Sequence, residues 1–180
     1  IPVTLEGNNG QKITKESKYK VSILSSLASD VAITTGRLAH LEYGLGEDRL
    51  GGAKIGYLDS LVQLQVIGKI GKDYKIQLAP GRIAYIPDDQ VTLMPKGSFA
   101  PASLTGNVSV YGDEKYDYVS LSLGTRLPYQ SFQELDPSRL VVDVYGATNN
   151  SNWITQLQTA KEVSHVDYEQ LADGIFRLKI

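Results

Sequence analysis

No cysteine occurs among the 180 residues, and histidine is nearly as scarce, represented only by His40 and His165. The lack of cysteine excludes a disulfide framework, a thiol nucleophile and a zinc site built on thiolates. The two histidines stand far apart in the sequence, and neither has a second ligand at the short spacing that zinc sites use. We therefore predict no catalytic residue and no metal ligand in this chain.

Charge of one sign and long apolar runs are missing as well. The net charge is -2 and the lysines and arginines are scattered singly, so no basic stripe is present to follow a nucleic acid backbone. No run approaches the roughly 20 apolar residues that a membrane span needs. We expect neither nucleic acid binding nor a membrane span, because the composition is that of an ordinary globular protein.

Short runs of alternating apolar and polar residues follow one another from Lys18 onward, separated by turn residues, and this pattern is typical of all-β proteins. In "VQLQVIGKI", the side chains of Val62, Leu64 and Val66 share one face of a predicted strand. Two further strands follow it after tight turns, which predicts an antiparallel meander. Only "NWITQLQTAKEV" has a helical look, and no βαβ rhythm is present.

A stretch rich in proline, glycine and serine, "PKGSFAPASLTG", divides the chain. It predicts a linker at 96–104 between a first domain, 1–95, and a second, 105–180. The core of the first domain is expected at about 30–95, with extra strands contributed by the residues before it.

The loop "YGLGEDRLGGAKIGYL", residues 43–58, raises the question of a phosphate site. Gly46 and Gly51 have the spacing of a phosphate-binding loop, but Gly52-Ala53 stands where a lysine and a hydroxyl are needed. The glycines are better explained by positive φ angles and tight reversals. The loop therefore gives little support to a nucleotide-binding function.

The charged tip of that loop and the tyrosines beside it are the candidate ligand-binding residues. Glu47, Asp48 and Arg49 would meet the amine and carboxylate groups of a muropeptide, although a solvated tip with an internal Asp–Arg contact explains them as well. Tyr43 and Tyr57 flank the loop, where a groove and a core position are about equally compatible with the pattern.

Three other positions are given structural roles. For Arg139 and Asp143 we expect a surface ion pair with a neighbouring strand, with a polar contact to glycan or to a septal protein as the alternative. Trp153, the only tryptophan, is expected to cap a sheet edge rather than to stack on a sugar.

The stretch "QLQVIGKIGKDYKIQLAPGRIAYIPDDQV" resembles a bacterial SH3 (SH3b) domain. It shows a strand, a glycine turn, a "YKIQL" strand, a Gly-Arg turn, and then an aromatic residue with Ile-Pro before the last strand. The resemblance implies a small SH3-like barrel whose irregular loop is the glycine-rich segment at 43–58.

From about Leu104 to Ile180 the chain resembles the AMIN domain, a non-catalytic β-sandwich that precedes the catalytic domain in bacterial N-acetylmuramoyl-L-alanine amidases. The matching stretches are "YVSLSLGTRLPYQSF", "DPSRLVVDVYGA", "VSHVDY" and "IFRLKI". The family's catalytic domain binds zinc through histidine and glutamate. The resemblance places that zinc and that chemistry in a separate carboxyl-terminal domain.

Together the resemblances imply a peptidoglycan-binding and targeting region of a cell-wall amidase, which takes part in peptidoglycan hydrolysis and cell-wall remodelling. The partner would be peptidoglycan, through its stem peptide or its glycan, and cell-division or envelope proteins are further candidates. A periplasmic or envelope location is expected. The chain opens with Ile-Pro rather than methionine, which suggests a fragment or a protein whose signal peptide has been removed.

Three alternatives remain open at this point. The segment could precede a cysteine endopeptidase of the NlpC/P60 type, with which SH3b domains are often joined. It could be a structural or adhesive part of a surface protein. A hydrolase that uses paired carboxylates is the least supported, because no two carboxylates have a setting that would separate their pKa values.

Overall fold

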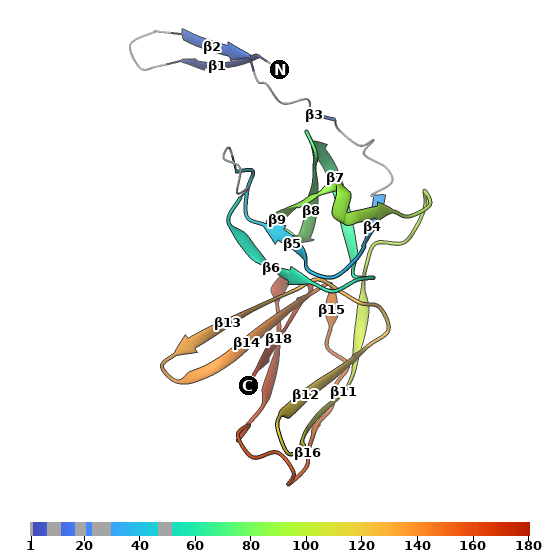
Figure 1. The fold of residues 1–180 in the computed structure, drawn as a ribbon, viewed down its shortest axis with the longest axis vertical. Coiled ribbons are helices and arrows are strands. Elements are labelled where there is room, and N and C mark those ends of the chain that lie inside the picture. The colour runs from blue at the N-terminus through green and yellow to red at the C-terminus, as the bar shows by residue number, and fades with distance from the viewer. Residues whose placement is uncertain (1, 7–11, 17–20, 23–29, 47–51) are drawn as a thin grey trace.

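The computed structural model describes residues 2–6, 12–16, 21–22, 30–46 and 52–180 (Figure 1). Every regular element in these ranges is a β-strand, except for two 3-10 turns, η1 (Asp88–Gln90) and η2 (Ala172–Gly174). The predicted all-β class is confirmed. No helix in the described ranges is long and apolar enough to cross a membrane.

Most of the strands before residue 95 form one antiparallel sheet of eight strands. Its order is β10-β4-β7-β8-β9-β5-β6, with β3 also paired to β7. The strands are β3 (Val21–Ser22), β4 (Asp30–Thr34), β5 (Ala39–Glu42), β6 (Lys54–Leu58), β7 (Gln63–Ile70), β8 (Asp73–Ala79), β9 (Arg82–Pro87) and β10 (Val91–Leu93). A separate hairpin pairs β1 (Pro2–Glu6) with β2 (Lys12–Glu16).

The sheet curls around one hydrophobic core. Leu64 and Val66 of β7 are fully buried in it, as is Ile76 of β8, so the predicted alternation is confirmed. Leu58 and Val91, from strands at opposite ends of the sheet, belong to the same core. The predicted meander is also present, because β7, β8 and β9 pair antiparallel in succession.

The remaining strands form two sheets of four strands each. The first, here called the β11 sheet, contains β11 (Ser103–Gly112), β12 (Asp117–Leu123), β15 (Ala147–Thr148) and β16 (Ile154–Gln156). The second, the β14 sheet, contains β13 (Tyr129–Leu135), β14 (Ser138–Tyr145), β17 (Asp167–Leu171) and β18 (Ile175–Lys179).

One apolar cluster joins the two sheets. Val108 and Val110 of β11 pack in it with Phe176 and Leu178 of β18. In β12, Val119, Leu121 and Leu123 alternate with polar residues and are partly buried against this cluster. At the end of the chain β17 and β18 form an antiparallel hairpin joined by η2.

The helical tendency of "NWITQLQTAKEV" is not realised. Its first part is β16, which pairs in parallel with β11, so that Ile154 lies beside Val108. The residues after Gln156 form a loop, and Asp117 of β12 accepts hydrogen bonds from the backbone N–H groups of Lys161, Glu162 and Val163. Non-local partners therefore override the local preference, and His165 lies in this connection rather than in a strand.

The first sheet contacts the pair of sheets directly. Tyr145 of β14 and Ile175 of β18 are buried in the hydrophobic core of the first sheet. The backbone N–H of Gln63 donates to the carbonyl of Arg126, and the guanidinium of Arg126 donates to the carbonyl of Ser60. Figure 1 shows β6 lying close to the near ends of β13 and β14. The connection at 94–102 has no regular structure, and β11 begins at Ser103.

Candidate functional site

The glycine-rich loop is described only at its two ends, so Glu47, Asp48 and Arg49 lie outside the described residues. At the base of the loop, the N–H of Gly52 donates to Oε2 of Glu42 at 3.0 Å. A Cβ on Gly52 would lie 1.8 Å from the carbonyl oxygen of Gly44. Glycine is needed here because the two chain segments approach so closely, not because of a positive φ angle.

The structure places the two candidate tyrosines against different partners. The Tyr43 ring is 58% exposed, and its hydroxyl accepts a hydrogen bond of 3.1 Å from Nε2 of Gln130, across the contact between the first sheet and the β14 sheet. Tyr57 packs edge-on against His40 at 6.2 Å, and Nζ of Lys54 lies 5.3 Å from its ring centroid. Their contacts do not bring them into one groove.

His40 is held between two polar side chains rather than free to bind a ligand. Its Nε2 lies 3.2 Å from Oε1 of the buried Glu42, and its Nδ1 lies 3.2 Å from Nε2 of Gln90. The amide N–H of Gln90 can donate only to an unprotonated Nδ1, so this contact favours the tautomer with its proton on Nε2, facing Glu42. This cluster links β5 to η1, and Glu42 connects it to Gly52 at the base of the glycine-rich loop.

The carboxylates beside this cluster do not assemble into a metal site. Burial is the main reason that the pKa of Asp73 is raised, and the charge of Glu42 is the next. Within the described ranges, no three histidine or acidic side chains converge closely enough to hold a metal ion. The described residues therefore do not provide a ligand set for the zinc of an amidase.

On the β14 sheet the charges are paired with one another. Arg177 donates to both carboxylate oxygens of Asp143, at 2.6 and 2.8 Å, and Arg139 of β14 pairs with Glu134 of β13. The prediction that Arg139 and Asp143 pair with neighbouring strands is confirmed. Asp143 is buried, however, so its pair is not a surface contact.

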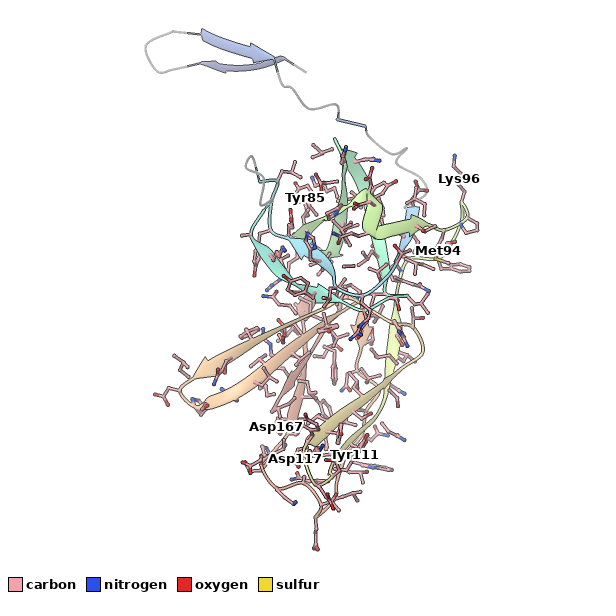
Figure 2. The ribbon with its side chains drawn as sticks, in the orientation of Figure 1. Tyr85, Met94, Lys96, Tyr111, Asp117 and Asp167 are labelled. Atoms are coloured by element: carbon pink, nitrogen blue, oxygen red, sulfur yellow. The ribbon has the colours of Figure 1, made fainter. Side chains whose placement is uncertain are left out.

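The outer side of the β11 sheet presents aromatic rings that sequence reasoning did not single out. Tyr111 and Tyr118 are cross-strand partners whose rings stack at 5.2 Å, and the ring of Tyr116 stands edge-on to Tyr118 at 6.4 Å. All three rings are exposed. Figure 2 shows Tyr111 near the end of β11 that lies farther from the first sheet.

Asp113 fixes this aromatic group in place. Its carboxylate accepts a hydrogen bond of 2.8 Å from the Tyr118 hydroxyl, and two more from the backbone N–H groups of Lys115 and Tyr116. The backbone bond from Lys115 is the largest reason that the pKa of Asp113 is lowered. The same hydroxyl bond raises the pKa of Tyr118, because the neighbouring carboxylate disfavours a phenolate.

Small side chains with hydroxyl groups occupy the middle of the outer side of the β11 sheet. Val108 and Val110 point into the core, so Ser109 between them points outward, beside its partners Ser120 and Thr155. None of these three side chains is charged. The alternating serines of "YVSLSLG" are the sequence signal that could have indicated this uncharged side of the strand.

A pocket of about 230 Å³ lies at the other end of this side. It is lined by Gly106, Asn107, Asn150, Ser151, Asn152 and Trp153. Trp153 is 70% exposed, so the expectation that it caps a sheet edge is wrong. The run of asparagines and serine before the tryptophan, "NNSNW", is the signal that could have indicated this pocket.

The pocket loop is held by partly buried hydrogen bonds. The Ser151 hydroxyl donates to the carbonyl of Gly106 at 2.6 Å, and the N–H of Asn150 donates to the hydroxyl of Thr105 at 2.8 Å. The Tyr168 hydroxyl donates to the carbonyl of Ser151. These bonds fix the loop beside β11 through partners within the chain itself.

Comparison with known proteins bears on the same part of the chain. The family model of the AMIN domain matches residues 107–180. Neither the curated proteins nor the solved structures contain a significant match to the chain. The matched range begins at the pocket residue Asn107 and includes the exposed tyrosines and Trp153. Residues 107–180 are therefore similar to the AMIN domain, a module typical of the peptidoglycan-binding regions of amidases.

Proposed function

We propose that this chain is a non-catalytic region that binds peptidoglycan and targets an N-acetylmuramoyl-L-alanine amidase to the cell wall, in peptidoglycan hydrolysis and cell-wall remodelling. The AMIN domain at 107–180 is the observation on which the proposal rests. AMIN domains occur in periplasmic or envelope proteins, and we place this chain there.

The first sheet is proposed to be an SH3b-like domain. Its support is the meander of β7, β8 and β9, which realises the strand-and-turn pattern of the sequence resemblance, and the single core around which the sheet curls. We accordingly propose a division into 1–95, a linker at 96–104 and 105–180. The contacts of Tyr145 and Arg126 would keep the two domains together.

The proposed mechanism is an increase in effective concentration. Weak contacts to the wall would hold a tethered hydrolase near its bond, which raises turnover without adding chemistry to the reaction. The zinc and its ligands would belong to a separate catalytic domain. A parent of the NlpC/P60 type would use the same targeting mechanism, and the AMIN match favours an amidase over it.

The test is retention of the 180-residue chain on insoluble peptidoglycan. We expect the chain to sediment with purified sacculi, and a globular protein of similar size and charge to stay in solution. A variant with Asp48→Ala and Arg49→Ala measures the role of the glycine-rich loop. If the wild-type chain stays in solution at every sacculus concentration, wall targeting by this chain is refuted and the structural or adhesive alternative is preferred.

A further inference from the structure

We propose that the outer face of the β11 sheet binds the glycan strand of peptidoglycan rather than its stem peptide. The outer face is defined as the pocket beside Trp153, the half-buried Ser109, and the exposed side chains listed here: Tyr111, Tyr118, Ser120 and Thr155. This inference rests on the proposed function and specifies its ligand.

The arrangement of aromatic side chains is the first argument. Trp153 lies at one end of the outer face and the stacked pair of Tyr111 and Tyr118 at the other. Asn107, beside Trp153, and Tyr111 are four residues apart on β11, or about 13 Å at the rise of an extended strand. The C–H groups of a pyranose ring form an apolar surface that packs on such rings, while its hydroxyls remain accessible to polar groups. A short oligosaccharide laid along β11 would reach both ends.

Charge is the second argument. The outward side chains between the aromatic ends, Ser109, Ser120 and Thr155, are neutral hydroxyls that donate and accept hydrogen bonds. A glycan whose carboxyl groups are amide-linked to peptides is neutral as well. A stem peptide carries carboxylate and amine groups, which would need opposite charges across the interface.

The nearby acidic side chains are already occupied by the protein itself. Asp113 accepts from Tyr118 and from two backbone N–H groups, and Asp117 accepts from the backbone at residues 161–163. The charged side chains of Glu114 and Lys115 lie in the turn beyond the strand ends. The carboxylates beside the uncharged outer face therefore already have hydrogen-bond partners within the chain.

The pocket provides the polar recognition. Asn107, Asn150 and Asn152 are exposed along its wall, and their amides offer both donors and acceptors suited to the acetamido and hydroxyl groups of an amino sugar. The loop that bears Asn150 is fixed by the bond to Thr105 and by Ser151. A surface that is ordered before binding loses less conformational entropy on binding.

The single tryptophan makes the experiment specific, since its fluorescence reports on the pocket alone. The full chain is titrated with peptide-free glycan strands, prepared by amidase digestion of sacculi with the freed lactyl carboxylates then converted to amides, and separately with free stem peptide. We expect the strands to shift and saturate the Trp153 emission, and the stem peptide to leave it unchanged. Sedimentation with intact sacculi is measured in parallel.

Three variants test the residues. Tyr111→Ala and Tyr118→Ala should each weaken the binding of glycan strands. Trp153→Ala, whose binding is measured by calorimetry, should weaken it by about tenfold or more, as truncation of an aromatic anchor does. Tyr129→Ala, at an exposed tyrosine on β13 of the β14 sheet, is the matched control and should bind like the wild type. Thermal melts verify that each variant is folded.

The outcomes separate this inference from the proposed function. Retention on sacculi without any response to glycan strands, or with wild-type affinity in all three variants, would overturn the glycan site and leave wall targeting intact. A response to stem peptide alone would do the same. Failure to bind sacculi and strands alike would overturn both.

Discussion

Arg177 and Asp143 lie directly opposite each other on β18 and β14 and form a two-point ion pair, with Nε 2.6 Å from Oδ1 and a terminal nitrogen 2.8 Å from Oδ2. The Asp143 side chain is only 2% exposed. The hydrogen bond to Asp143 is the main reason that the pKa of Arg177 is raised. The pair therefore stabilises the centre of the β14 sheet.

Replacing Asp143 by alanine should be strongly destabilising, because it leaves the guanidinium of Arg177 half-buried without its partner. We expect the free energy of unfolding to fall by about 2–3 kcal/mol in urea titrations. The matched control is Glu134→Ala, which breaks the more exposed pair with Arg139 and should cost less than about 1 kcal/mol. Equal losses in the two variants would contradict the importance assigned to burial.

Tyr145 couples the two parts of the molecule. Its ring lies in the core of the first sheet, and its hydroxyl donates to Oε1 of Gln130, whose Nε2 donates to Tyr43. We expect Tyr145→Ala to destabilise the protein by about 3–5 kcal/mol, as for other large aromatic truncations, and to split one thermal transition into two. Calorimetry measures both effects. Tyr129→Ala, on the exposed side of β13, should keep a single transition, and a single transition in Tyr145→Ala would refute the coupling.

Asp117 makes the loop after β16 sensitive to acid. Its pKa is lowered, most strongly by the backbone hydrogen bond from Val163. A lowered pKa in the folded state means that the stabilisation is complete above the ordinary carboxyl value of 3.8 and is lost as the pH falls through the folded-state value. Melting temperatures measured between pH 7 and pH 2 should therefore fall more steeply for the wild type than for Asp117→Asn.

The variant Asp117→Asn should also melt below the wild type at pH 7, because a neutral amide accepts these backbone bonds less strongly. Glu114→Gln, in the exposed hairpin turn, provides the control for removing one acid. Identical pH curves for Asp117→Asn and the wild type would show that the carboxylate does not hold the loop.

Two glycines offer a matched test of the base of the glycine-rich loop. Alanine at Gly52 would place its Cβ 1.8 Å from the carbonyl oxygen of Gly44, whereas a Cβ at Gly56 would have no heavy atom within 4 Å. We expect Gly52→Ala to lower the free energy of unfolding by about 1–3 kcal/mol, as overpacking does, and Gly56→Ala to have little effect. Urea unfolding of the two variants compares them, and similar stabilities would mean that the segments separate without cost.

Alternation along single strands was sufficient to predict much of the fold. Leu64 and Val66 are buried as expected because side chains in a strand alternate between two faces, and this depends only on neighbours in the sequence. The turns at Gly71 and Gly81 have positive φ angles, which glycine adopts readily. The AMIN-like stretches were likewise readable without a structure, because they are local patterns.

Tertiary structure alone decided which polar and aromatic residues lie together. Ile154 pairs with Val108 across 46 positions of sequence, and that parallel pairing turns an apparent helix into a strand and leaves Trp153 exposed beside Asn107. Tyr111 and Tyr118 become one aromatic group only through the register of β11 and β12. The sequence determined the all-β class and the inward side of each predicted strand, whereas strand pairing decided the outer face, because contacts between distant segments have no local signal in the chain.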